Sequence, residues 1–207
     1  MITHLEVFEI STPGDLAGFF RGKRPQLWGV GNCEILTRPL LGIVSARQIN
    51  HDLAIKSDEL MKQLAILRQV AFISGWHSQL EKQSLRLLLS HKASLVLCLA
   101  KALDRFKASG EVGERVGAGK ALLLTHCSPR AKRISRDASV RRNELVIGLA
   151  AAVLVLSAPE GSASFNLARA ALDAQKPVFT LDHHLNRKLL ASSGSVATFE
   201  SICAALR

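Results

Sequence analysis

Residues 40–47, LLGIVSAR, and residues 152–164, AVLVLSAPEGSAS, show the same pattern twice. Each segment begins with an apolar run rich in Val, Ile and Leu and then turns into small polar residues. The apolar runs lack strict alternation, which indicates strands that are buried on both faces. Hydroxyl residues directly after such a strand are typical of a helix start. Both segments therefore predict a strand that leads into a helix.

Similar apolar runs recur along the chain, and helical patterns lie between several of them. Further candidate strands occupy residues 26–30, 70–74, 93–100, 121–125 and 177–181. One candidate helix follows Asn50, a possible N-cap, and places Leu53, Leu60, Met61, Leu64 and Leu67 on one face. This alternation predicts an α/β fold with a doubly wound, mainly parallel sheet and helices on both faces.

Length and composition indicate one globular domain. The chain has 207 residues, of which 48% are hydrophobic and 21% charged, and a chain of this size buries about 70% of its unfolded surface. We expect a short N-terminal extension at residues 1–25 and a single domain at residues 26–207. No secretory signal or membrane-spanning run is visible, so we expect a cytoplasmic protein. The scattered cysteines predict reduced core thiols at Cys33, Cys98, Cys127 and Cys203.

The chain is strongly basic, with 27 Lys and Arg against 17 Asp and Glu and a formal net charge of +10. Half of this excess lies in residues 130–142, RAKRISRDASVRR. We expect a basic loop there that leads into a helix starting at Arg141. Clustered cations suit a polyanionic partner such as a nucleic acid. The alternative is a solvated charged face.

Small polar residues follow three of the expected strands, at residues 45–47, 74–78 and 157–164. Doubly wound sheets bind ligands outside the carboxyl ends of their strands, where the strand order reverses. Backbone N–H groups and hydroxyls beside helix N-termini are suited to phosphate. Ordinary helix capping explains each loop taken singly. Trp76, in the second loop, belongs either to the core or to a base-stacking surface.

Catalytic motifs are weak in this chain. Residues 113–120, GERVGAGK, lack two requirements of a P-loop, because Glu114 replaces a glycine and Ala121 replaces the Ser or Thr that holds magnesium. The triplet Asp182-His183-His184 has no further Asp and His cluster to complete a two-metal site. We therefore expect no enzymatic activity, no metal and no cofactor.

Taken in order, the segments resemble the Rossmann-like domain of the DNA processing protein A family, also called DprA or Smf. Residues 41–47, LGIVSAR, are similar to the family's A-I-V-G-S-R, and Ser74-Gly75 stands where the family has S-G-x-A-R-G-I-D. Residues 140–150, VRRNELVIGLA, resemble P-x-R-N-R-I-I-A-G-L-S, and residues 158–168, APEGSASFNLA, resemble E-A-x-x-x-S-G-S-L-x-T-A. The resemblance covers most of the chain.

The resemblance implies a dimerising, Rossmann-like protein that binds single-stranded DNA in a basic pocket and helps to load a RecA-type recombinase during recombination or DNA uptake. Arg47 becomes the central phosphate ligand. The other implied phosphate or nucleic-acid ligands are Ser45, Gly75, Lys132, Arg133, Arg136, Arg141, Arg142, Asn143, Gly161, Ser162 and Ser164.

The chain departs from the family pattern in three motifs. Ser45-Ala46 replaces Gly-Ser, Ser78 replaces an Arg, and Glu144 replaces the second Arg of R-N-R. Two positive groups near the pocket are therefore missing, and the basic run at residues 130–142 is placed to compensate.

Two other functions stay open. Related Rossmann-like families bind nucleotides, or cleave the base from nucleoside monophosphates with a glutamate that falls on Leu167 or Ala168 here. Hydrolysis is therefore disfavoured, because general acid–base catalysis needs a titratable group at that position. A nucleotide sensor without turnover remains an alternative. A self-associating structural protein whose basicity serves only solubility is the third interpretation.

Overall fold

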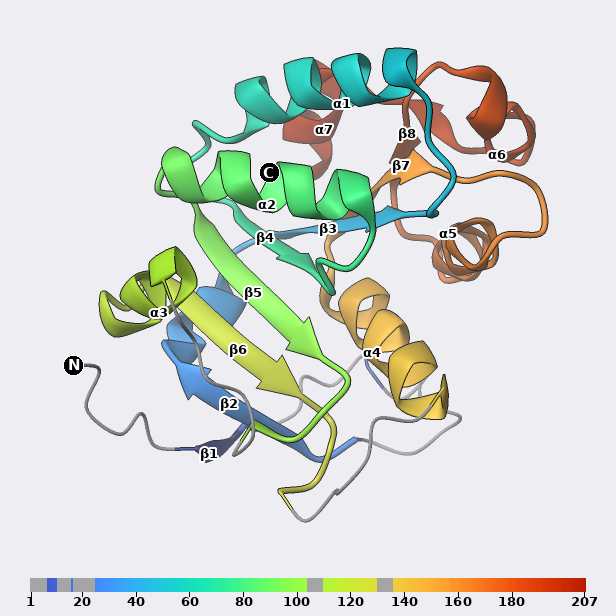
Figure 1. The fold of residues 1–207 in the computed structure, drawn as a ribbon. Helices are drawn as coiled ribbons and strands as arrows, with labels where there is room; N and C mark the ends of the chain where they lie inside the picture. Colours follow the sequence, from blue (N-terminus) through green and yellow to red (C-terminus); the bar gives the residue numbers. More distant parts are fainter. Residues whose placement is uncertain (1–6, 11–15, 17–24, 104–109, 130–135) are drawn as a thin grey trace.

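The computed structural model describes residues 7–10, 16, 25–103, 110–129 and 136–207. Within them, one sheet has the strand order β1-β2-β6-β5-β4-β3-β7-β8-β9 (Figure 1). The strands are β1 (Phe8–Ile10), β2 (Leu27–Gly31), β3 (Leu40–Ser45), β4 (Ala71–Ser74), β5 (Ser94–Leu99), β6 (Ala121–Thr125), β7 (Ala152–Ser157), β8 (Val178–Thr180) and β9 (Ser195–Val196). The helices are α1 (His51–Leu64), α2 (Gln79–Ser90), α3 (Gly110–Gly117), α4 (Arg136–Leu149), α5 (Ala163–Asp173), α6 (Arg187–Ala191) and α7 (Phe199–Ala205), with short 3₁₀ helices η2 (Cys33–Thr37) and η4 (His184–Asn186).

The central part of the sheet is parallel. β3, β4, β5 and β6 follow one another outward from the middle in chain order, and β7 then pairs with the other side of β3. Among the described strands, only β2 runs in the opposite direction, at the β6 edge, where it pairs antiparallel with both β6 and β1. The strand order therefore reverses between β3 and β7, which is where a doubly wound sheet opens a ligand-binding crevice.

Helices cover both faces of the sheet (Figure 1). Leu41 and Ile43 of β3 belong to a core cluster with side chains of α1, α2, α3 and α7. Leu40 and Val44 of the same strand belong to a second cluster, with side chains of α4, α5 and α6. Alternate residues of one strand thus pack into opposite layers, which explains why its apolar run is continuous.

Side-chain caps fix where three helices begin beside the carboxyl edge. The Asn50 side chain accepts a hydrogen bond from the Leu53 N–H at the start of α1. Ser78 caps α2 in a reciprocal capping box with Glu81. Ser162 caps α5 by accepting from the Phe165 N–H. Each cap satisfies an N–H group that a helix start otherwise leaves unpaired, so the loop before it is held in place.

The predicted doubly wound architecture is confirmed, and all seven candidate strands are present. Three details differ. The helix expected to start at Arg141 is already formed at Arg136, so Arg141 and Arg142 lie in its second turn. Cys33 is exposed, although Cys98 and Cys127 are buried; all four cysteines are free thiols. In the predicted extension, Phe8–Ile10 pairs with β2 and Leu16 is fully buried, while the boundary at residue 26 stays a prediction.

Candidate nucleic-acid interface

A cavity of about 870 Å³ lies at the carboxyl ends of β3, β4 and β7, beside the reversal of strand order. Its walls come from the loops after these strands and from one side of α4. Seven of the predicted ligand residues line it: Ser45, Arg47, Arg142, Asn143, Gly161, Ser162 and Ser164. Segments that are far apart in the sequence are therefore brought together at the predicted place.

Two other predicted residues that the structure describes, Gly75 and Arg141, do not line this cavity. Gly75 lies behind the Arg142 side chain, and Arg141 is exposed and pairs with Asp137, with its Nε 3.0 Å from Oδ2. Lys132 and Arg133 lie outside the described residues, and so does the side chain of Arg136. Whether the basic run extends the interface stays a prediction.

Arg142 and Arg47 differ sharply in setting. Arg47 is exposed at the cavity, and its side chain has no partner among the described residues. Arg142 is only 7% exposed; its Nε donates to Asn143 Oδ1 at 2.7 Å, and its buried Nη1 has no described hydrogen-bond acceptor. Burial lowers the pKa of Arg142, while the nearby Glu81 carboxyl group opposes the shift. A guanidinium stays protonated in proteins, so Arg142 is a buried cation that lacks a partner for one of its donors.

Gly75 makes room for this guanidinium. A Cβ atom at residue 75 would lie 2.5 Å from Arg142 Nη1 and 2.6 Å from its Cζ. No heavier residue fits without displacing Arg142. The glycine therefore serves the cavity indirectly, by admitting a cation from α4.

Glu81 was not predicted as a site residue, yet it holds two of the loops together. Its carboxyl group is buried and accepts hydrogen bonds from the N–H groups of Ser45 at 2.9 Å, His77 at 2.7 Å and Ser78 at 3.1 Å. Burial raises its pKa, whereas these three N–H donors and Arg142 oppose that shift. The sequence did contain a signal, because Ser78 followed three residues later by Glu81 is a capping-box pattern.

The β7–α5 loop offers a different kind of surface. Gly161 has φ +75°, a backbone conformation that favours glycine. The Ser162 hydroxyl caps Phe165, and the Ser164 hydroxyl donates to the Ser157 carbonyl at 2.8 Å. Within the described structure the N–H groups of Ala163 and Ser164 have no partner. These two groups and the positive end of α5 can receive an anion oxygen.

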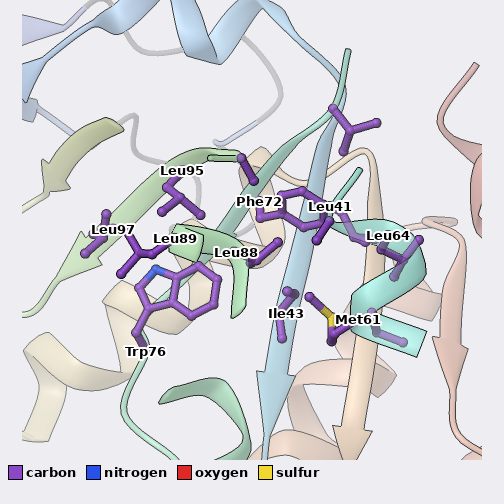
Figure 2. Packing of buried hydrophobic residues seen from close by; sticks show 14 of the residues in the cluster. Leu41, Ile43, Met61, Leu64, Phe72, Trp76, Leu88, Leu89, Leu95 and Leu97 are labelled. Carbon is purple, nitrogen blue, oxygen red and sulfur yellow. The ribbon is translucent and has the colours of Figure 1, made fainter. Parts of the chain in front are cut away.

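Trp76 belongs to the core and is not a stacking platform. It is 6% exposed, and its Nε1 donates to the Val96 carbonyl at 3.2 Å. Figure 2 shows the indole packed near Leu88, Leu89 and Leu97. The structure thus decides between the two interpretations that the sequence left open.

The family is identified by a sequence model of DNA recombination-mediator protein A, which matches residues 16–204. The chain belongs to this family. Among solved structures, DNA processing protein A from Streptococcus pneumoniae superposes with a TM-score of 0.82 at 19% identity, over 100% of this chain and 76% of that one. The Helicobacter pylori protein gives a TM-score of 0.78 at 20% identity, over 99% of both chains. The predicted resemblance and the Rossmann-like fold are confirmed.

A more distant likeness shares only the fold. The molybdenum cofactor carrier protein of Chlamydomonas reinhardtii gives a TM-score of 0.55 at 15% identity, over 82% of this chain and 98% of that one. No curated protein matches the chain in sequence.

The part of the chain that the structure describes has neither a membrane-spanning helix nor a cluster of metal ligands. No helix there has the length and apolar character to cross a membrane. No group of three or more His, Cys, Asp or Glu side chains there could hold a metal ion. What the described cavity can do chemically is bind phosphate, through two cations and the start of α5.

Proposed function

We propose that this family member binds single-stranded DNA by its phosphates at the carboxyl edge of the sheet and acts as an accessory to recombination or DNA uptake. One observation carries the proposal: a single cavity unites Arg47, Arg142 and the N-terminal end of α5. The Helicobacter pylori relative is described as binding single-stranded DNA. The net charge of +10 supports a polyanionic ligand.

The two cations have complementary parts in this proposal. Arg47 is exposed and free to meet a phosphate that arrives from solvent, while Arg142 is held at the back of the cavity by Gly75 and Asn143. A buried cation in a low-dielectric setting interacts strongly with an incoming anion. Charge-assisted hydrogen bonds to phosphate oxygens follow.

The wider setting is part of the same proposal. We place the protein in the cytoplasm as a homodimer that helps to load a RecA-type recombinase onto the strand, without catalysis of its own. Family membership supports this role. The proposed lack of catalysis is supported by the residues at the position of the glutamate that base hydrolysis needs. That position holds Leu167, which lines the cavity, or the fully buried Ala168.

Fluorescence anisotropy of a labelled single-stranded oligonucleotide at several salt concentrations tests the proposal. We expect submicromolar binding, a steep salt dependence and poor competition by mononucleotides. Arg47→Ala should weaken binding at least tenfold, about 1.4 kcal/mol, because a charge-assisted phosphate contact is lost. Arg86→Ala is the matched control, since Arg86 is exposed on α2 and does not line the cavity. Equal affinities of both variants would remove Arg47 from the interface.

A nucleotide sensor is the second candidate, and the cavity volume favours it. About 870 Å³ is within the range of pockets that enclose whole small ligands. In that case a mononucleotide should raise the melting temperature and displace the oligonucleotide at similar concentrations. Absent strand binding together with such stabilisation would replace the DNA-binding proposal.

A further inference from the structure

The cavity is larger than a phosphate needs. Its volume of about 870 Å³ suits a ligand of several hundred Å³. Phosphate-binding groups account for only part of the lining. Val140, Leu167 and His77 also face the cavity, and Val140 is 49% exposed despite being apolar. Apolar and ring surfaces beside a phosphate site are suited to a nucleobase.

The β4–α2 loop fixes the backbone at Trp76 and His77. Trp76 adopts φ +56°, which is uncommon for a residue with a bulky side chain. Its indole is fixed in the core, and the next N–H group, that of His77, donates to Glu81 Oε2 at 2.7 Å. The backbone is therefore fixed on both sides of Trp76, and the exposed His77 side chain that follows lines the cavity.

His77 has the chemistry of a base contact and not of a phosphate contact. Desolvation and the positive charges of Arg142, Lys82 and Lys101 lower its pKa from 6.5 to about 4. The imidazole is therefore neutral at pH 7 and adds no charge to attract phosphate. Among the described residues that line the cavity, only His77 carries an aromatic ring. Proteins that bind single strands commonly stack bases on such rings.

We propose that the cavity accommodates a whole nucleotide of single-stranded DNA, with its phosphate at Arg47 and the start of α5 and its base against the His77 ring. This base subsite rests on the proposed strand binding and adds a specific contact to it. The neutral ring contributes affinity for the base and leaves the number of phosphate contacts unchanged.

The test compares two oligomers of equal length, one of deoxythymidine and one of abasic tetrahydrofuran nucleotides. The wild type should bind the deoxythymidine oligomer about tenfold more tightly. His77→Ala should reduce this preference to within twofold, while its affinity for the abasic oligomer and its salt dependence stay at wild-type values. His77→Phe should retain the preference, because it keeps an aromatic ring. Gln79→Ala, at an exposed neighbour outside the cavity, is the matched control.

Each contrary result has a distinct meaning. A tenfold preference that survives in His77→Ala overturns the base subsite and leaves strand binding intact. An equal loss of affinity for both oligomers overturns it as well, because His77 then acts on the phosphates or on the loop. Failure of the wild type to bind either oligomer overturns the proposed function and the subsite together.

Discussion

The β4–α2 and β7–α5 loops border the same cavity and lead into helices of 12 and 11 residues. They differ in whether their backbone N–H groups are available to an anion. In the β4–α2 loop, the N–H groups of His77 and Ser78 are already occupied by the carboxyl group of Glu81. In the β7–α5 loop, the N–H groups of Ala163 and Ser164 are unpaired within the described structure. A strand end followed by a helix is therefore not in itself a phosphate site.

The difference assigns separate tasks to the two loops. A phosphate oxygen can be received where donors are unpaired, which is at α5. The β4–α2 loop instead provides a rigid frame, because Glu81 also binds the N–H group of Ser45 and so joins the loop to the end of β3. Arg142 lies against this frame at Gly75 and faces the cavity. Rigidity on one side and unpaired donors on the other favour a preorganised binding site.

Removal of Glu81 should have the largest effect on this arrangement. Glu81→Ala leaves the buried N–H group of Ser78 and the part-buried N–H groups of Ser45 and His77 without their acceptor. A buried donor left unsatisfied costs about 1–3 kcal/mol. We expect the free energy of unfolding, measured by urea denaturation, to fall by about 3–5 kcal/mol. Glu59→Ala, at an exposed position of α1, should change it by less than about 0.5 kcal/mol. A loss below about 1 kcal/mol for Glu81→Ala would show that the loop keeps its shape without the carboxyl group.

Gly75→Ala should have a smaller effect on stability and a clear effect on binding. The new Cβ atom would lie 2.5 Å from Arg142 Nη1, so the guanidinium must move. We expect a loss of about 1–3 kcal/mol in unfolding free energy from the forced repacking, and about tenfold weaker strand binding by anisotropy.

Gly117→Ala is the control for this substitution. Gly117 ends α3, and a Cβ atom there meets nothing within 4 Å. Alanine should be neutral or slightly stabilising at that position. If Gly75→Ala bound DNA as the wild type does, the position of Arg142 would be irrelevant to the ligand.

The sequence was sufficient for the fold and for the location of the cavity. Apolar runs such as residues 40–45 and 152–157 reveal strands buried on both faces, and their alternation with helices fixes the edge where ligands bind. The short strands β1 and β9 escaped detection, because neither is a run of buried apolar residues: only Ile10 of β1 is buried, and both residues of β9 are exposed. Cys33 was misjudged because it belongs to a short 3₁₀ helix and not to a buried strand.

The roles of individual site residues depended on geometry that a sequence does not display. Arg141 and Arg142 are adjacent in a basic run, and only the phase of α4 sends Arg142 into the cavity while Arg141 pairs with Asp137. The sequence around Glu81 shows its place at a helix start but not its hydrogen bond with the Ser45 N–H group, because Ser45 lies 36 positions earlier in the chain. Such contacts arise from the topology of the sheet and not from local pattern.

The smallest expected effect concerns the cap of the phosphate-receiving loop. The Ser162 hydroxyl already accepts a hydrogen bond from the Phe165 N–H at 3.1 Å and lies 3.0 Å from the Ser164 hydroxyl. We therefore expect the backbone N–H groups of α5, and not this side chain, to bind the phosphate. Ser162→Ala should therefore lower the unfolding free energy by about 1 kcal/mol, as the loss of an N-cap does, and leave strand affinity within twofold. Ser162→Asn, which restores a capping oxygen, should recover most of the stability. Tenfold weaker binding with normal stability would instead make the hydroxyl a direct phosphate ligand and would shift the receiving surface from the backbone of α5 to its side chains.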